Sequence, residues 1–294
     1  MLWAVFTLIA AAAQTARNAM QRELTASLGT VGATHVRFLF GFPFAVLLLA
    51  GLVAITGDKL PAMPPVFWPW VIGGALGQIA ATALMLAAMG ERSFVVAYAY
   101  IKTEPVQVAL FGLVFLGDKL TALGAVAIVV ATIGVIVISL KPGAGSTGTT
   151  RSTLIGLGGG TMFALSAISY RGAILSLGLS DFVLAATFTV TVGLVIQAAL
   201  LSAYLALRDP GVLRAIARAW RPSLFAGFMG AFASEFWFLA FAITTAANVR
   251  TLALVEVLFA QGVTRFVFKQ PTTRREGVGI VLVVIGVALL VWAY

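Results

Sequence analysis

Apolar runs of about 20 residues, separated by short polar breaks, follow one another along the whole chain. A run of this length crosses the hydrocarbon core of a bilayer as an α-helix, whereas barrel strands would alternate polar and apolar positions over about 10 residues. The pattern therefore predicts an all-α polytopic membrane protein with ten transmembrane helices. Their expected ranges are 2–24, 29–56, 66–90, 94–116, 121–140, 153–177, 181–207, 222–243, 246–269 and 275–294.

One polar break is longer and more flexible in composition than the others. Residues 141–152 read KPGAGSTGTTRS and are rich in Gly, Ser and Thr, as flexible linkers are. This linker separates five predicted helices in residues 1–140 from five in residues 153–294. The chain is thus expected to consist of two five-helix units.

The two units show signs of a common origin. With a shift of 152 positions, Glu104 falls on Glu256 and Gly134 on Gly286. Because five is an odd number, the second unit must enter the membrane from the opposite side. We therefore expect a five-plus-five inverted repeat around a central cavity, with the substrate site near the membrane midplane.

Composition narrows the classes of function. The chain is 61% hydrophobic and only 10% charged, whereas soluble domains carry about 25% charged residues. It has no Cys and a single His, His35, so neither a metal site nor a cofactor is predicted. The net charge of +9 is better explained by basic loops than by nucleic-acid binding. The phosphate-binding motif Gly-x-x-x-x-Gly-Lys-Ser/Thr does not occur, which argues against ATP hydrolysis.

Basic residues predict the orientation. Only Lys59 and Lys119 stand out in the loops after the even-numbered helices, whereas the loops after the odd-numbered helices are strongly basic. The basic set is Arg22, Arg92, Lys141, Arg151, Arg208, Arg214, Arg218, Arg221, Lys269, Arg274 and Arg275. Since Lys and Arg mark cytoplasmic loops, both termini are expected outside, in a plasma membrane of the bacterial inner-membrane type. The apolar N-terminal segment lacks a positive n-region and is interpreted as the first spanning helix.

The connection before the eighth predicted helix is amphipathic. One stripe is apolar and consists of Leu213, Ile216, Ala217 and Trp220, and the other is basic and consists of Arg214, Arg218 and Arg221. This pattern predicts a short helix lying on the cytoplasmic surface of the membrane. The alternative is an extension of the eighth helix.

Glu104 and Glu256 are the first candidate site residues. A carboxylate at bilayer depth is costly unless it is paired, protonated or hydrated, so each marks a potential functional site. Pro105 follows Glu104 and should kink its helix. On a regular helix Lys102 points away from Glu104, and the two reach one cavity only if the kink rotates them. Otherwise Lys102 pairs with another helix, for which Glu235 is a candidate. The alternative to a functional site is that these charges form buried ion pairs that only hold the helices together.

Other residues complete the candidate site. Tyr98, Tyr100, Tyr170 and Trp237 combine an apolar ring with a hydrogen-bonding group and could form an amphipathic wall for a ligand. His35 is expected to form an interhelical hydrogen bond, with proton transfer as the alternative. Arg250 is a candidate partner for a substrate carboxylate. Arg17 and Arg250 lie near predicted membrane edges, and snorkelling to the interface is the expected role of both, with carboxylate binding as the alternative for Arg250.

The chain resembles the EamA type of the drug/metabolite transporter superfamily. The residues that carry the resemblance are Pro105, the turn Gly117-Asp118-Lys119-Leu120, Gly124, Gly134, Gly277 and Gly286. Two features depart from the usual pattern: Glu256 stands where the family often has proline, and Gln270-Pro271 replaces a Gly-acid turn. With the tyrosine-rich fourth helix, these departures resemble the YddG group of aromatic and neutral amino-acid exporters. The resemblance implies a basket of helices around a central cavity.

Two classes of function follow from these observations. The first is a secondary exporter of small metabolites, foremost aromatic or neutral amino acids, working by alternating access. Cationic drugs and nucleotide sugars stay open as alternative substrates. The second class is a membrane-embedded enzyme acting on lipids, but it would need a nucleophile–base pair or a metal cluster at the interface. The expectation is therefore a transporter and not an enzyme.

Overall fold

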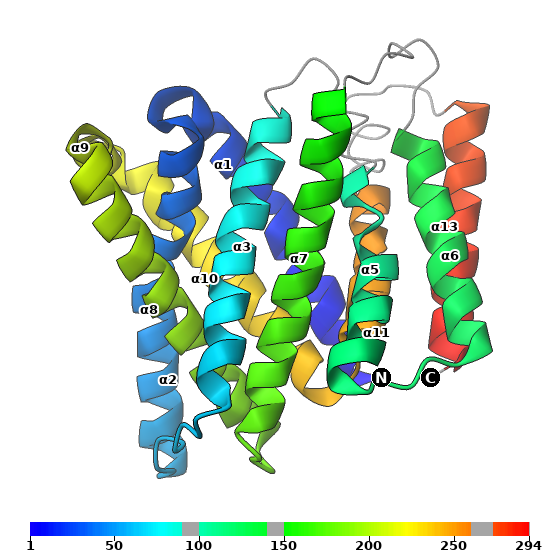
Figure 1. Ribbon diagram of the computed structural model, residues 1–294, viewed down its shortest axis with the longest axis horizontal. Coiled ribbons are helices and arrows are strands. Elements are labelled where there is room, and N and C mark those ends of the chain that lie inside the picture. The colour runs from blue at the N-terminus through cyan, green and yellow to red at the C-terminus, as the bar shows by residue number, and fades with distance from the viewer. Residues whose placement is uncertain (90–99, 140–149, 260–272, 294) are drawn as a thin grey trace.

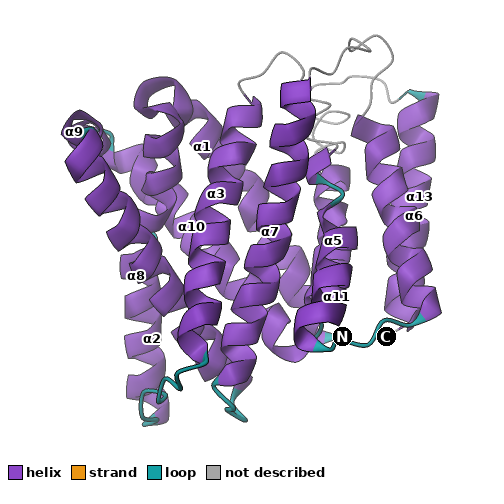
Figure 2. Cartoon of the chain, in the orientation of Figure 1, coloured by secondary structure: helices purple, strands orange, loops and turns teal. Residues whose placement is uncertain are grey.

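The computed structural model describes residues 1–89, 100–139, 150–259 and 273–293. Within these ranges the chain is helical without any strand (Figure 2). Seven of the described helices are long and apolar enough to cross a membrane. The helices are α1 Leu2–Leu39, α2 Phe42–Thr56, α3 Phe67–Met89, α5 Glu104–Phe111, α6 Ala122–Ser139, α7 Thr150–Ser176, α8 Phe182–Arg208, α9 Pro210–Arg218, α10 Trp220–Ile243, α11 Ala246–Leu252 and α13 Arg274–Ala293. A π-helical segment, η1 (Gly112–Leu116), continues α5, and a 3-10 turn, η2 (Ala253–Val255), continues α11.

Figure 1 shows the helices side by side, with both chain ends at the same edge of the molecule. Helix α7, the first helix after the middle of the chain, starts at the opposite edge. The most extensive helix–helix contacts join α1 to α10, α3 to α7 and α6 to α13. Each of these pairs joins one helix of the first half of the chain to one of the second, so the halves are interleaved.

Helix α1 reverses direction within its length. Gly29 has φ 68° and ψ 175°, a backbone conformation that is open mainly to glycine. Across this turn the Gln21 side chain donates a hydrogen bond of 2.9 Å to the Ala33 carbonyl. The expected helix 29–56 is interrupted after Leu39, which corrects the prediction. Pro43 lies at the start of α2, where its ring and missing N–H are incompatible with a continuous helix through Leu39.

Pro105 has the expected effect on the fourth predicted helix. Helix α5 begins at Glu104 with the proline in its first turn, and the two preceding residues form a turn. The Thr103 hydroxyl donates to the Tyr100 carbonyl over 2.7 Å, which satisfies an acceptor that the break would leave free. The prediction of a kink at this position is confirmed.

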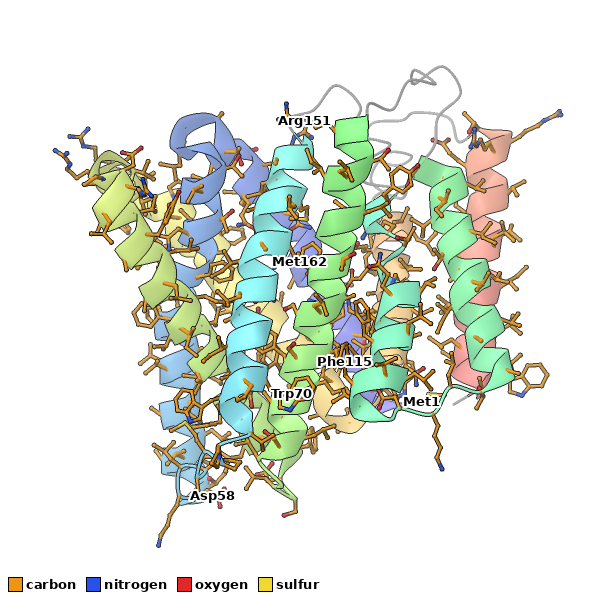
Figure 3. All side chains as sticks on the ribbon, in the orientation of Figure 1. Met1, Asp58, Trp70, Phe115, Arg151 and Met162 are labelled. Atoms are coloured by element: carbon orange, nitrogen blue, oxygen red, sulfur yellow. The ribbon has the colours of Figure 1, made fainter. Side chains whose placement is uncertain are left out.

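The short amphipathic helix before α10 is present as α9. Ile216 is buried at 1% exposure. The helix ends at Arg218 and is followed by Ala219, which has a non-helical φ/ψ of −89°/29°. Trp220 and Arg221 belong to α10 and not to α9, which corrects the expected extent. In Figure 3, Arg151 lies at the same edge as α9, and Asp58 lies at the opposite edge.

Glycines let α6 and α13 approach closely. A Cβ on Gly134 would lie 2.7 Å from the Val283 backbone nitrogen, and one on Gly286 would lie 2.6 Å from that of Ala131. Such distances exclude a side chain without movement of the backbone. The two contacts correspond to each other under the shift of 152 positions that aligns the two halves.

Candidate substrate site

Two ion pairs join the break before α5 to the helix α11 and its continuation. Arg250 binds Glu104 with Nε 2.6 Å from Oε1 and Nη2 2.6 Å from Oε2. Lys102 forms an ion pair with Glu256, and all four side chains are nearly buried, at 7–12% exposure. Each segment thus contributes one acid and one base, so the charges of the two pairs are reciprocal.

Local irregularity in both segments brings these side chains together. The turn before Pro105 reorients Lys102 relative to Glu104, so both reach the α11 segment. On the other side, the 3-10 turn η2 ends immediately before Glu256. Two sequence expectations need correction. Lys102 pairs with Glu256 instead of Glu235, and Arg250 does not extend to the interface because Glu104 holds it inside the bundle.

Gln14 and Trp237 connect the ion pairs to α1 and α10. The Gln14 amide donates to Glu256 Oε2 over 3.3 Å, and its oxygen accepts from Trp237 Nε1 over 3.2 Å. The Arg250 guanidinium lies 4.9 Å from the Trp237 ring centroid, within the range of a cation–π interaction. A continuous polar network therefore runs from Lys102 to the aromatic side chains of α10.

A small cavity lies beside this network. Its lining residues are Gln14, Arg37, Gln78, Phe163, Ser166, Ala167, Tyr170, Trp237, Phe238, Phe241 and Arg250. The volume open to water is about 20 Å³, enough for one water molecule and too little for an amino acid. A substrate can therefore enter this space only if the surrounding helices move apart.

Arg17 and Arg37 are buried near the same cavity, each at 1% exposure. Arg37 donates to Thr82 over 3.2 Å and to Ser234 over 3.3 Å. Arg17 was expected to snorkel, and its burial corrects that prediction. Neither arginine is among the site residues that the sequence predicts. The sequence feature that could have indicated their burial is that both lie within apolar runs. These two runs become neighbours through the turn at Gly29.

Residues 1–140 match the family model of the EamA-like transporter family. Proteins of the EamA-like family are membrane transporters and not enzymes, so the prediction that this chain is not an enzyme is confirmed. With its apolar spans, the chain is a multi-pass membrane protein, and the family implies a small-molecule substrate and contact with lipid.

The fold has a solved counterpart. A protein of known crystal structure aligns over 99% of this chain and 95% of its own, with a TM-score of 0.74 and 15% sequence identity. At this identity the similarity concerns the fold alone. A search of curated proteins gives no match.

The remaining expected site residues are distributed unevenly around the cavity. Tyr170 lines the cavity and packs on Phe238 with ring centroids 4.6 Å apart. Tyr100 is half-buried and lies outside the cavity lining, and Tyr98 lies outside the described residues. His35 is fully buried, and its Nε2 lies 3.0 Å from the Ser202 hydroxyl of α8. The expected interhelical hydrogen bond is confirmed, and His35 does not line the cavity.

Glu235 lies in a groove that is separate from the cavity beside the ion pairs. It lines a groove of about 580 Å³ between α2, α8 and α10 whose other lining side chains are apolar apart from Thr187. The Thr187 hydroxyl donates to Glu235 Oε1 over 2.6 Å. The groove is much larger than the cavity beside the ion pairs, but it contains none of their side chains. We therefore place the candidate substrate site at the smaller, charged cavity.

Proposed function

We propose that this chain is a secondary transporter that exports small zwitterionic metabolites, with aromatic and neutral amino acids as the substrate class. The observation that carries the proposal is the pair of reciprocal ion pairs, Glu104 with Arg250 and Lys102 with Glu256, beside an aromatic cavity. These residues offer both signs of charge next to the rings of Trp237 and its neighbours.

A zwitterion can exchange partners with such ion pairs. Its ammonium group replaces Arg250 or Lys102 at a glutamate, and its carboxylate binds a guanidinium that this exchange releases or that lies nearby. Since the charges remain paired throughout, the desolvation cost of opening the site is limited. The rings of Trp237 and Phe163 supply apolar contacts for the substrate side chain.

The inverted repeat and alternating access are part of the same proposal. In it, residues 1–140 and 153–294 are five-helix units related by an approximate two-fold axis in the membrane plane, joined by the linker 141–152. Two observations support this arrangement. Glu104 and Glu256, which the shift of 152 positions aligns, are each paired with a base from the other half of the chain, and Gly134 and Gly286 make matching contacts in the α6–α13 interface. Rocking of one unit against the other would then open the cavity to each side in turn.

The proposed setting is the plasma membrane of a bacterium, with both termini outside. The support is the clustering of basic residues in one set of predicted loops. Arg151 belongs to this set and lies at the same edge as α9 (Figure 3). Export of cationic drugs is less compatible with the cavity, which presents the guanidinium groups of Arg37 and Arg250. Nucleotide sugars remain the alternative substrate class that this positive charge favours.

Counterflow in proteoliposomes tests the proposed function. Vesicles containing the purified chain are loaded with unlabelled phenylalanine, and uptake of labelled phenylalanine is measured against empty vesicles. We expect accelerated uptake that tryptophan and leucine inhibit, and that choline and a nucleotide sugar do not. Uptake of the nucleotide sugar or of an organic cation, with no amino-acid exchange, would refute the substrate class.

A further inference from the structure

Two arginines from the two arms of α1 converge on one glycine of α10. A Cβ on Gly230 would lie 3.0 Å from Arg37 Cγ and 3.4 Å from Arg17 Cδ, so both side chains pass over the same point of the helix. Arg17 is within electrostatic range of Arg37 and of Arg250. Three guanidinium groups therefore gather in the interior of the bundle.

The hydrogen-bond partners of Arg17 and Arg37 are neutral. Besides the contacts of Arg37 with Thr82 and Ser234, Arg17 Nη2 donates to Asn18 Oδ1 over 2.7 Å. Within the described parts of the chain, Arg17 Nε, Arg17 Nη1 and Arg37 Nε have no hydrogen-bond acceptor. None of the ion pairs found there includes either arginine.

The nearby carboxylates are already engaged. Glu104 binds Arg250 and Glu256 binds Lys102. Among the described residues around the cavity, the two arginines Arg17 and Arg37 are therefore in excess over the carboxylates. A guanidinium keeps its proton in proteins, and a buried cation without a counter-ion is strongly unfavourable. Free N–H groups in a fixed planar fork are suited to the two oxygens of a carboxylate or to a phosphate.

We propose that Arg17 and Arg37 form the subsite for the anionic group of the substrate. This inference rests on the proposed function, under which the group is the carboxylate of an amino acid. Arg37 lines the same cavity as Arg250 and Trp237. A carboxylate bound by Arg37 leaves the substrate side chain beside Trp237 and its ammonium group toward the glutamates. Binding of the anion also provides the counter-charge that the two arginines lack.

The test uses the intact chain in detergent and measures displacement of labelled phenylalanine. The competitors are phenylpropionate, which lacks the ammonium group, phenethylamine, which lacks the carboxylate, and phenyl phosphate. We expect phenylpropionate to compete and phenethylamine to be at least about tenfold weaker than phenylalanine, because the amine leaves the guanidinium groups unpaired. Equal competition by phenethylamine and phenylalanine would overturn the inference.

Variants of the two arginines test whether these side chains bind the carboxylate of the substrate. Arg37→Gln and Arg17→Gln should each weaken phenylalanine binding at least about tenfold, with a melting temperature equal to or above that of the unchanged chain, since an uncompensated buried charge is removed. If Arg37→Gln fails to fold, Arg37→Lys replaces it in the binding assay, because lysine retains the positive charge. Arg218→Gln, on the exposed face of α9, is the matched control and should bind normally. Unchanged binding in Arg37→Gln and Arg17→Gln refutes the subsite.

The outcomes separate this inference from the proposed function. If amino acids are exchanged but the arginine variants bind them normally, the function stands and the subsite is wrong. If no amino acid binds, but phenyl phosphate raises the melting temperature of the unchanged chain and not of Arg37→Gln, the anion subsite stands and the substrate class is wrong. If no amino acid binds, and neither phenyl phosphate nor phenylpropionate changes the melting temperature, both the proposed function and the anion subsite are refuted.

Discussion

Glu104 and Arg250 come from positions 146 residues apart and meet through two contacts of 2.6 Å in the interior of the bundle. Beside them, Lys102 and Glu256 pair with the opposite polarity. Because each segment carries one acid and one base, separating the segments breaks both pairs at once. The two pairs are therefore expected to open together and not independently.

The first prediction concerns Glu104→Gln. The variant leaves Arg250 buried without its carboxylate, and the loss of one partner of a buried pair costs about 3–5 kcal/mol. We expect a clearly lower melting temperature of the purified protein. The double variant Glu104→Gln/Arg250→Gln removes both charges and should recover much of the loss, although counterflow stays absent. If Glu104→Gln alone melts at the same temperature as the unchanged chain, the ion pair with Arg250 does not stabilise the fold as described.

Glu235 provides a contrasting prediction. Its Oε1 accepts a hydrogen bond from Thr187, whereas its Oε2 has no acceptor or donor partner among the described residues. Glu235→Gln retains an oxygen that Thr187 can donate to and removes a buried carboxyl group. Stability should stay within about 1 kcal/mol of the unchanged chain or rise. A loss as large as that of Glu104→Gln would mean that Glu235 has a charged partner.

The close contact of α6 and α13 makes a third prediction. Gly134→Val places a side chain where even a Cβ would lie 2.7 Å from the Val283 nitrogen, so the helices must separate. Overpacking of this kind costs about 1–3 kcal/mol, measurable as a lower melting temperature in detergent. Gly277→Ala is the control, since a Cβ there meets nothing within 4 Å. It should be neutral or slightly stabilising.

Membrane orientation is the fourth prediction. The chain has no Cys, so single cysteines can be introduced without background labelling. We expect Ala62→Cys to react with an impermeant maleimide in intact cells, and Ala217→Cys on α9 to react only after the membrane is opened. Both positions are exposed in the fold. The reverse labelling pattern would show that the termini lie inside.

The sequence by itself determined the helices and several of their irregularities. Apolar runs place most helix ends within a few residues, because crossing a bilayer requires a fixed length of apolar chain. Pro105 predicts the break before α5, since proline lacks an N–H wherever it stands. The burial of Glu104 and Glu256 also follows from their positions in apolar runs, which are local properties of the chain.

The tertiary structure alone decided which charges meet. Lys102 pairs with Glu256 and not with Glu235, and the partner of Glu104 lies in the other half of the chain. Arg17 lies in an apolar run, but the sequence does not show which groups surround it, because its environment depends on the reversal at Gly29 and the approach of α10. Side-chain periodicity specifies the face of a helix but not the neighbour that covers it. Pairing across the bundle is fixed by how the helices pack, which no local pattern records.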